Sequence, residues 1–206
     1  MATISAPRGF QPVGNAFNGY TTGGFRKYKI ASNETYAIGN GDPVVMLTTG
    51  STRGTIQRFN TTVAATTITA SGTFLGVFTG CEYTDPSTGQ KVFNHFYPGA
   101  IVASDIWATV YDDPDQIFSL QADGAVAQTS LGCNFAIIQT AVTNTVTKNS
   151  GLQLDASSNA ATTTLPVRVV DFDVKPGYNS IGDAYTDVLV RFNNHFHRQL
   201  TGVAAS

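Results

Sequence analysis

Hydrophobic and polar residues alternate along much of the chain, with the period of two that is typical of β-strands. In Ile101–Tyr111 the even-numbered positions from 106 onward are apolar, and Asp, Trp, Thr and Tyr occupy odd-numbered ones. The alternation returns near the C-terminus at Val188, Val190 and Phe192. No long segment combines helical spacing with capping residues. Many short strands separated by Gly- and Pro-containing turns predict an all-β fold, a small β-barrel or β-sandwich with long polar loops.

The stretch from Gly41 to Gly80 is the most informative part of the sequence. It begins with a turn and the apolar run Pro43–Leu47, passes through a polar, Thr-rich excursion, and ends with a second apolar run around Gly76. Glycine is common where the strands of a barrel bend or bulge. The stretch therefore predicts a small β-barrel unit. Further along, Asp85–Gly89 predicts the turn of a hairpin.

The composition divides the chain into four parts. Residues 1–25 are rich in Gly, Asn and aromatic residues without any period, and we interpret them as an extended N-terminal arm. Residues 26–139 are expected to form the barrel-like domain, and residues 140–164 a Thr-, Ser- and Asn-rich surface loop or a loosely paired hairpin. Residues 165–206 are expected to complete the β core. Within them, Leu165–Val174 is apolar in both phases, which predicts a strand buried on both faces.

The arm carries the candidate partner-binding residues, which are Phe10, Phe17, Tyr20 and Phe25. A segment with almost no charge and several spaced rings is expected to dock onto its own domain or onto a neighbouring molecule. We expect this arm to become ordered in an assembly. We also expect its deletion to weaken that assembly while the β domain stays folded.

Charged residues make up only 13% of the chain, about half of what is usual in globular proteins. Polarity comes instead from Thr, Ser, Asn and Gly, which suits extended protein–protein contacts and equally suits an ordinary β-sheet surface. The net charge is −2, and the densest basic run, Arg26–Lys29, is too short for a nucleic-acid-binding surface. With neither a signal-peptide pattern nor an apolar run of about 18 residues, we expect a soluble protein made in a cytoplasm, without membrane or direct nucleic-acid partners.

Two motifs contain residue types that can bind a metal ion. Asp112, Asp113 and Asp115 offer three carboxylates, but they lack the spacing of a calcium loop and surround a proline, which favours a structural turn. His195 and His197 share one face of a strand and could form half of a transition-metal site. Polar surface residues are the favoured interpretation of this pair. We therefore predict no metal site and no cofactor.

The remaining chemistry of the sequence also points away from catalysis. Cys81 and Cys133 are the only cysteines, and free buried thiols are favoured over a disulfide between them. There is no G-x-S-x-G nucleophile elbow and no glycine-rich phosphate loop. We predict that the protein is not an enzyme and has no catalytic residues.

A group of aromatic residues supplies an alternative function. These residues could form a platform for a sugar, although aromatic side chains on strands more often pack sheet against sheet. They are Phe93, Phe96, Tyr97, Trp107 and Tyr111. The alternative to a structural role is thus a carbohydrate-binding or adhesive β module.

Three segments resemble the head decoration proteins of tailed bacteriophages. Tyr36–Gly39, Gly41–Val45 and Phe74–Gly80 are similar to a Gly-Asp-Pro-Val and Leu-Gly-Val strand pair, which in those proteins belongs to a small capsid-binding β domain. The rest of the chain resembles virion structural proteins of marine phages, through Glu82–Asp85, Val110–Asp115, Asn179–Ala184, Val188–Val190 and Asn194–His195.

The resemblance covers residues 8–196 and implies a cement function. Such a protein binds the major capsid protein on the outside of the expanded shell and resists the internal pressure of packaged DNA. It would be located on the surface of the virion, would act as a homotrimer, and would carry no catalytic residues.

Overall fold

The computed structural model describes residues 4–15, 24–59, 66–68, 73–143 and 146–198 of the 206-residue chain. Strands account for 44% of the structure and helices for 4%, so the predicted all-β class is confirmed. The only helical segments in the described ranges are two 3-10 turns, η1 (Gln128–Ser130) and η2 (Phe196–Arg198). No helix among these residues is long and apolar enough to cross a membrane.

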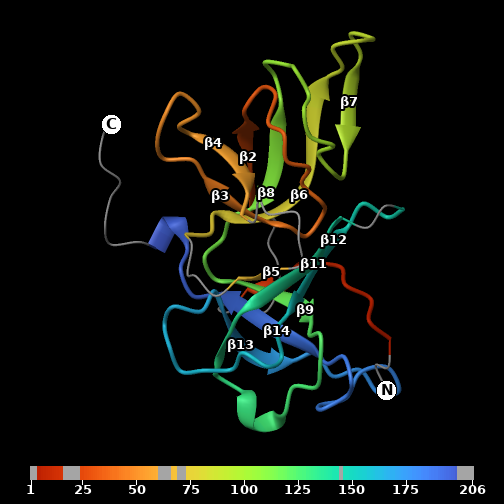
Figure 1. The fold of residues 1–206 in the computed structure, drawn as a ribbon, viewed down its shortest axis with the longest axis vertical. Coiled ribbons are helices and arrows are strands. Elements are labelled where there is room, and N and C mark those ends of the chain that lie inside the picture. Colours follow the sequence, from red (N-terminus) through yellow and green to blue (C-terminus); the bar gives the residue numbers. More distant parts are fainter. Residues whose placement is uncertain (1–3, 16–23, 60–65, 69–72, 144–145, 199–206) are drawn as a thin grey trace.

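Five strands close into a barrel, which lies in the upper half of Figure 1. In hydrogen-bonded order the strands are β3 (Pro43–Met46), β4 (Thr55–Arg58), β2 (Phe25–Ile30), β8 (Trp107–Tyr111) and β6 (Gly76–Thr84). A further pairing between β3 and β6 closes the ring. The strand β7 (Lys91–Asn94) pairs with β6 outside the ring and is the last strand in the order of this sheet.

The local signals in the barrel are confirmed. Alternate residues of β8 are buried, in the phase that the sequence predicts. The register between β6 and β8 shifts between Phe78 and Gly80, so a bulge occurs at a glycine. β6 and β7 form the predicted hairpin, in which the N–H of Gly89 donates to the carbonyl of Asp85 at 2.8 Å. Gly89 has a φ of 70°, a conformation that glycine adopts without strain.

The lower half of the molecule contains a second, open sheet of five strands (Figure 1). Its order is β1 (Gln11–Asn15), β9 (Gln116–Gln121), β14 (Asp187–Phe192), β13 (Val167–Phe172) and β10 (Asn134–Phe135). A three-stranded sheet, β12 (Ser150–Leu154), β11 (Ile137–Thr143) and β5 (Thr66–Ile68), lies between it and the barrel. The chain leaves the barrel after β8, so β9 and β10, which the sequence groups with residues 26–139, belong to the second sheet.

Each half has its own hydrophobic cluster. The barrel cluster includes Ile30, Val44, Ile56, Phe78 and Val110, all nearly or fully buried. The second cluster includes Phe10, Phe118, Phe135, Leu152 and Val190. Phe74, at the entrance to β6, joins the halves because its ring stacks on Phe192 of β14, with 4.5 Å between ring centroids.

Three expectations about the chain outside the barrel are corrected. Residues 11–15 are a strand of the second sheet and not an arm. Residues 140–164 are not one continuous surface loop, because β12 within them is buried at all five positions and pairs with β11, as the hairpin alternative requires. Residues 156–164, after β12, are intermediate or exposed. β13 is buried mainly on one face, since Val167 and Val169 are buried and Asp171 is exposed.

Candidate functional site

Two of the three segments that resemble head decoration proteins, Gly41–Val45 and Phe74–Gly80, meet where the barrel closes. Pro43 pairs with Val77 and Val44 with Gly76. The N–H of Leu75 donates to the carbonyl of Val44 at 2.8 Å, which extends the contact. A side-chain carbon at Gly76 would lie 1.9 Å from the carbonyl oxygen of Tyr111, so only glycine lets β6 approach β8 here. The pairing of Pro43 and Val44 with Val77 and Gly76 therefore closes the barrel.

Asp42 of the same motif is a fully buried carboxylate at the base of the barrel. It accepts hydrogen bonds from the N–H of Gly39 at 2.8 Å and from the amide of Gln139 at 3.4 Å. Burial raises the pKa of Asp42 to about 6, although the side chain of Ser150, the Gly39 N–H and the charge of Arg58 oppose the rise. Because Gln139 and Ser150 come from β11 and β12, Asp42 ties the barrel to the three-stranded sheet.

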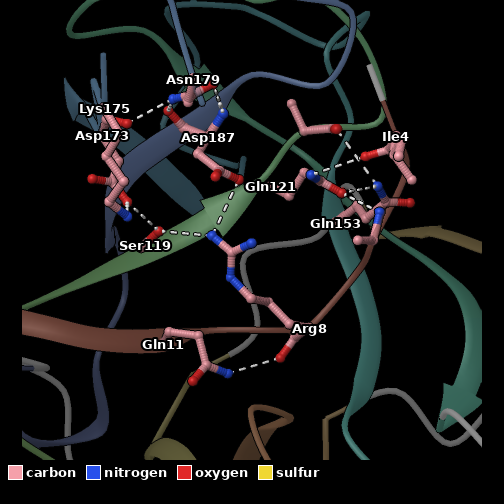
Figure 2. A network of polar contacts seen from close by, with 12 residues as sticks. Ile4, Arg8, Gln11, Ser119, Gln121, Gln153, Asp173, Lys175, Asn179 and Asp187 are labelled. Carbon is pink, nitrogen blue, oxygen red and sulfur yellow. Dashed lines mark hydrogen bonds and ion pairs between the residues drawn. The ribbon is translucent and has the colours of Figure 1, made fainter. Parts of the chain in front are cut away.

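The N-terminal segment is anchored on the second sheet, as Figure 2 shows. The guanidinium of Arg8 lies 3.2 Å from the buried carboxylate of Asp187 and donates to the hydroxyl of Ser119 at 3.3 Å. Ahead of it, the N–H of Ala6 donates to the side-chain oxygen of Gln121 at 2.7 Å. These contacts hold the segment before β1 across β9 and β14.

The predicted partner-binding aromatics do not form one surface. Phe10 is only 1% exposed, and its ring packs edge-on against Phe118 and Phe192, with centroids 5.6 and 5.0 Å apart. Phe10 therefore docks onto its own domain and not onto a neighbouring molecule. It is not available to a partner. Phe25 belongs to β2 and is 55% exposed. Phe17 and Tyr20 lie outside the described residues.

The aspartates at 112–115 form the expected turn. The carboxylate of Asp113 accepts the N–H of Asp115 at 2.8 Å, and Asp115 forms an ion pair with Arg198. Asp112 is 5% exposed and accepts the Tyr28 hydroxyl at 2.6 Å, with Arg26 Nε at 3.4 Å. Each carboxylate therefore serves a different partner. Among the described residues, no group of three or more His, Cys, Asp and Glu side chains could hold a metal ion.

The two C-terminal histidines differ from the predicted pair of surface residues. His195 is 2% exposed, and its Nδ1 accepts the backbone N–H of His197 at 3.2 Å. Burial, helped by the charge of His197, lowers the pKa of His195 to about 4. His197 is partly exposed and contacts Asp112, with 3.3 Å between Nε2 and Oδ2. The sequence places these residues on the surface, and that is wrong for His195 because the chain after β14 packs back onto Phe74.

The opposed pKa shifts of Asp42 and His195 predict a pH dependence. The stabilising contribution of neutral Asp42 is present below its unfolded pKa, near 4, and is lost as the pH rises through 6. The contribution of neutral His195 is present above 6.5 and is lost as the pH falls through 4. The two effects therefore offset each other between pH 6.5 and 4.

An Asp42→Asn variant should show the pH effect of His195 without the opposing effect of Asp42. Between pH 7 and 4 its free energy of unfolding should fall by up to about 3 kcal/mol more than that of the natural chain. Melting temperatures from circular dichroism at both pH values measure the difference. Equal pH slopes in the two proteins would mean that Asp42 is not protonated on acidification of the folded state.

The two cysteines are free thiols, which agrees with the favoured interpretation. Cys81 is buried in the barrel and donates to the carbonyl of Phe96 at 3.3 Å. Its burial raises the pKa of the thiol to about 12. Cys133 is half-buried. A thiol that keeps its proton is a poor nucleophile, so Cys81 acts in packing.

The five aromatic residues considered as a sugar platform are divided between the core and the surface. Tyr97 is fully buried and donates its hydroxyl to the carbonyl of Glu34 at 3.0 Å. Phe96 and Tyr111 are half-buried. Only Phe93, which is 74% exposed, and Trp107, which is 36% exposed, project from the barrel. The five residues therefore form no single platform.

Further apolar side chains are exposed in connections of the second sheet, in the half of the molecule away from the barrel. Leu131 follows η1, and Val174, Tyr178 and Ile181 lie in the connection between β13 and β14. Their exposed fractions are 41–58%. The N–H of Gly182 donates to the carbonyl of Val126 at 3.1 Å, which holds the connection against the segment that leads into η1. We call these four residues the distal apolar end.

Comparison with protein-family models, with curated proteins and with solved structures finds no match for this chain.

Proposed function

We propose that the protein is a structural component of a tailed-phage virion that binds the outside of the capsid and stabilises the expanded shell against the pressure of packaged DNA. The observation that carries this proposal is the closure of the barrel. Two of the motifs that resemble head decoration proteins, Gly41–Val45 and Phe74–Gly80, form one hydrogen-bonded strand pair, although the paired positions are 32 and 34 residues apart in the sequence. The resemblance thus falls on residues that define the barrel, which supports a shared architecture.

The partner in this proposal is the major capsid protein, and the distal apolar end is the surface that contacts it. Exposed apolar side chains grouped at one end of a protein mark sites of protein–protein contact. The scarcity of charge elsewhere lowers the desolvation cost of packing such a surface on a lattice. Docking by this end would leave the barrel pointing away from the shell.

The proposed oligomer is a homotrimer at a symmetry axis of the lattice. A trimer presents three copies of the same contact, so a modest affinity of one copy is multiplied by avidity. Isolated monomers that each contact only the shell would exclude this part of the proposal.

Co-sedimentation with purified capsids tests the function. The protein should bind expanded shells, bind unexpanded shells weakly, and raise the melting temperature of the expanded shell. Replacing Leu131 and Tyr178 with Asp should abolish binding, because charges would then be buried without partners. The control is Val102→Asp, which changes a 63%-exposed apolar residue outside the distal apolar end and should bind normally. Absence of binding by the natural chain to either form of shell would refute the proposal.

A further inference from the structure

A hollow of about 380 Å³ opens on the outer surface of the barrel where β6, β7 and β8 run side by side. It is lined by the bulge at Thr79 and Gly80, by Thr109 of β8, and by Glu82, Phe93, Asn94 and His95. Its volume falls within the range of about 300–1,000 Å³ of small-molecule sites. Neither the barrel closure nor the distal apolar end uses this surface.

One exposed aromatic ring, Phe93, lines the hollow, and a second, Trp107, lies outside its lining on the same face of the sheet. Phe93 of β7 and Trp107 of β8 both pair in register with Glu82, one on each side of β6. They are therefore two strand spacings, or roughly 10 Å, apart on the same face of the sheet. The negative faces of aromatic rings attract weakly positive C–H groups. Two rings at this spacing can contact two successive rings of an elongated ligand.

Polar groups in the hollow supply hydrogen-bond acceptors: Glu82 lies between the two rings, and His95 lies two residues beyond Phe93. Oε1 of Glu82 is paired with Lys27 Nζ at 2.9 Å. Nε2 of His95 lies 2.9 Å from the carbonyl of Thr147 and so donates to it, which leaves Nδ1 of the neutral ring as an acceptor.

The charge of the hollow is balanced. Glu82 is the only charged residue in its lining, and Lys27 already neutralises that carboxylate. No Lys or Arg lines the hollow itself, although outside it Lys29 places Nζ 5.9 Å from the centroid of the Trp107 ring. A cationic ligand would compete with Lys27 for Glu82. The surface is therefore suited to a neutral ligand with apolar faces and many hydroxyl groups.

We propose that this hollow binds a neutral oligosaccharide. The apolar faces of two sugar rings stack on Phe93 and Trp107, and hydroxyl groups donate to Glu82 and His95. The binding site does not depend on the proposed capsid function. On a particle docked by the distal apolar end, however, the hollow faces the surroundings, where it can contact glycans of a host cell.

Fluorescence of the free protein gives a direct test, because Trp107 is the only tryptophan of the chain. The probes are neutral tetrasaccharides of glucose, galactose, mannose and N-acetylglucosamine, titrated to millimolar concentration. At least one of them should produce a saturable change in the emission of Trp107. Phe93→Ala should weaken that binding about tenfold.

The matched control is Phe25→Ala. Phe25 also projects from the barrel and is 55% exposed, but it does not line the hollow, so this variant should bind the sugar normally. Both variants should keep the melting temperature of the natural chain, because neither ring is in the core.

Two results would overturn the proposal. One is the absence of any emission change with the whole panel, and the other is equal affinity of the Phe93→Ala and natural chains. If Phe93→Ala loses capsid binding and no sugar binds, the β7 edge is a protein-docking edge and the sugar proposal is wrong. Sugar binding without capsid binding would instead refute the capsid function and leave this site standing.

Discussion

Replacing Phe10 with alanine is expected to lower the free energy of unfolding by about 3–5 kcal/mol, the usual cost of removing a buried phenyl ring. Phe10 is 1% exposed and contacts both Phe118 and Phe192, so its loss leaves a cavity beside these two rings. For a chain of this length the change corresponds to a fall in melting temperature of about 10 °C. Thermal unfolding followed by circular dichroism measures it.

Phe25→Ala is the control for this prediction as well, because the same ring is removed from a position that is 55% exposed. Its melting temperature should change by no more than about 2 °C. If the two variants were equally stable, the N-terminal segment would be an independent arm. If Phe10→Ala is the less stable variant, as expected, deletion of residues 1–15 should unfold the second sheet. A loss of capsid binding in that deletion would then report unfolding and would not test whether the segment docks on a partner.

Replacing Gly76 with alanine is expected to be the most damaging change of a single methyl group in the barrel. The added carbon would lie 1.9 Å from the carbonyl oxygen of Tyr111, and neither backbone can move without breaking the β6–β8 or β3–β6 pairing. We expect a loss of about 3 kcal/mol or more in the free energy of unfolding. Chemical denaturation with urea, followed by the emission of Trp107 in β8, reports on the barrel.

Gly24→Ala provides the comparison for Gly76. At Gly24 the nearest atom to the added carbon is Cβ of Asp113 at 3.6 Å, which is an ordinary contact. This variant should stay within about 1 kcal/mol of the natural chain. Similar urea midpoints for the two variants would mean that β6 does not approach β8 as closely as the barrel requires.

The barrel could be predicted largely from local signals. Alternation places the buried residues of β8, the Asp85–Gly89 sequence specifies a hairpin turn, and the glycines at 76 and 80 mark a close approach and a bulge. The alternation and the hairpin turn depend on residues that are close in the sequence, whereas the glycines mark their positions locally but approach or pair with the distant strand β8. The phage-like motifs also contain local turn and strand patterns, so they can be recognised in the sequence without knowledge of the strands that pair with them.

The second sheet could not be predicted in the same way. β1 contains Pro12 and Gly14 and shows no alternation, and it is a strand only because β9, about 100 residues later, pairs with it. As an edge strand with a bulge, it can contain a proline. β12 has Ser and Gln at buried positions. Its Gln153 is accommodated because the amide lies within hydrogen-bonding distance of Gln121 and Ala122.

The candidate sites show the same limit. The sequence groups Phe93 and Trp107 with three other aromatic residues. Their exposure and their common register with Glu82 come from the pairing of three strands. The buried roles of Asp42, Asp187 and His195 had no sequence signal, because an isolated polar residue next to a turn or strand is usually solvated. Burial of these groups is decided by contacts between distant segments.

An electron-microscopy reconstruction of the virion that contains this protein tests the capsid function most directly. We predict extra density on the outer surface of the expanded shell, arranged as trimers, into which the barrel and the second sheet fit. The distal apolar end should face the major capsid protein, and the barrel with its hollow should point outward. A shell without such density, or the protein located in the tail or inside the capsid, would contradict the proposal.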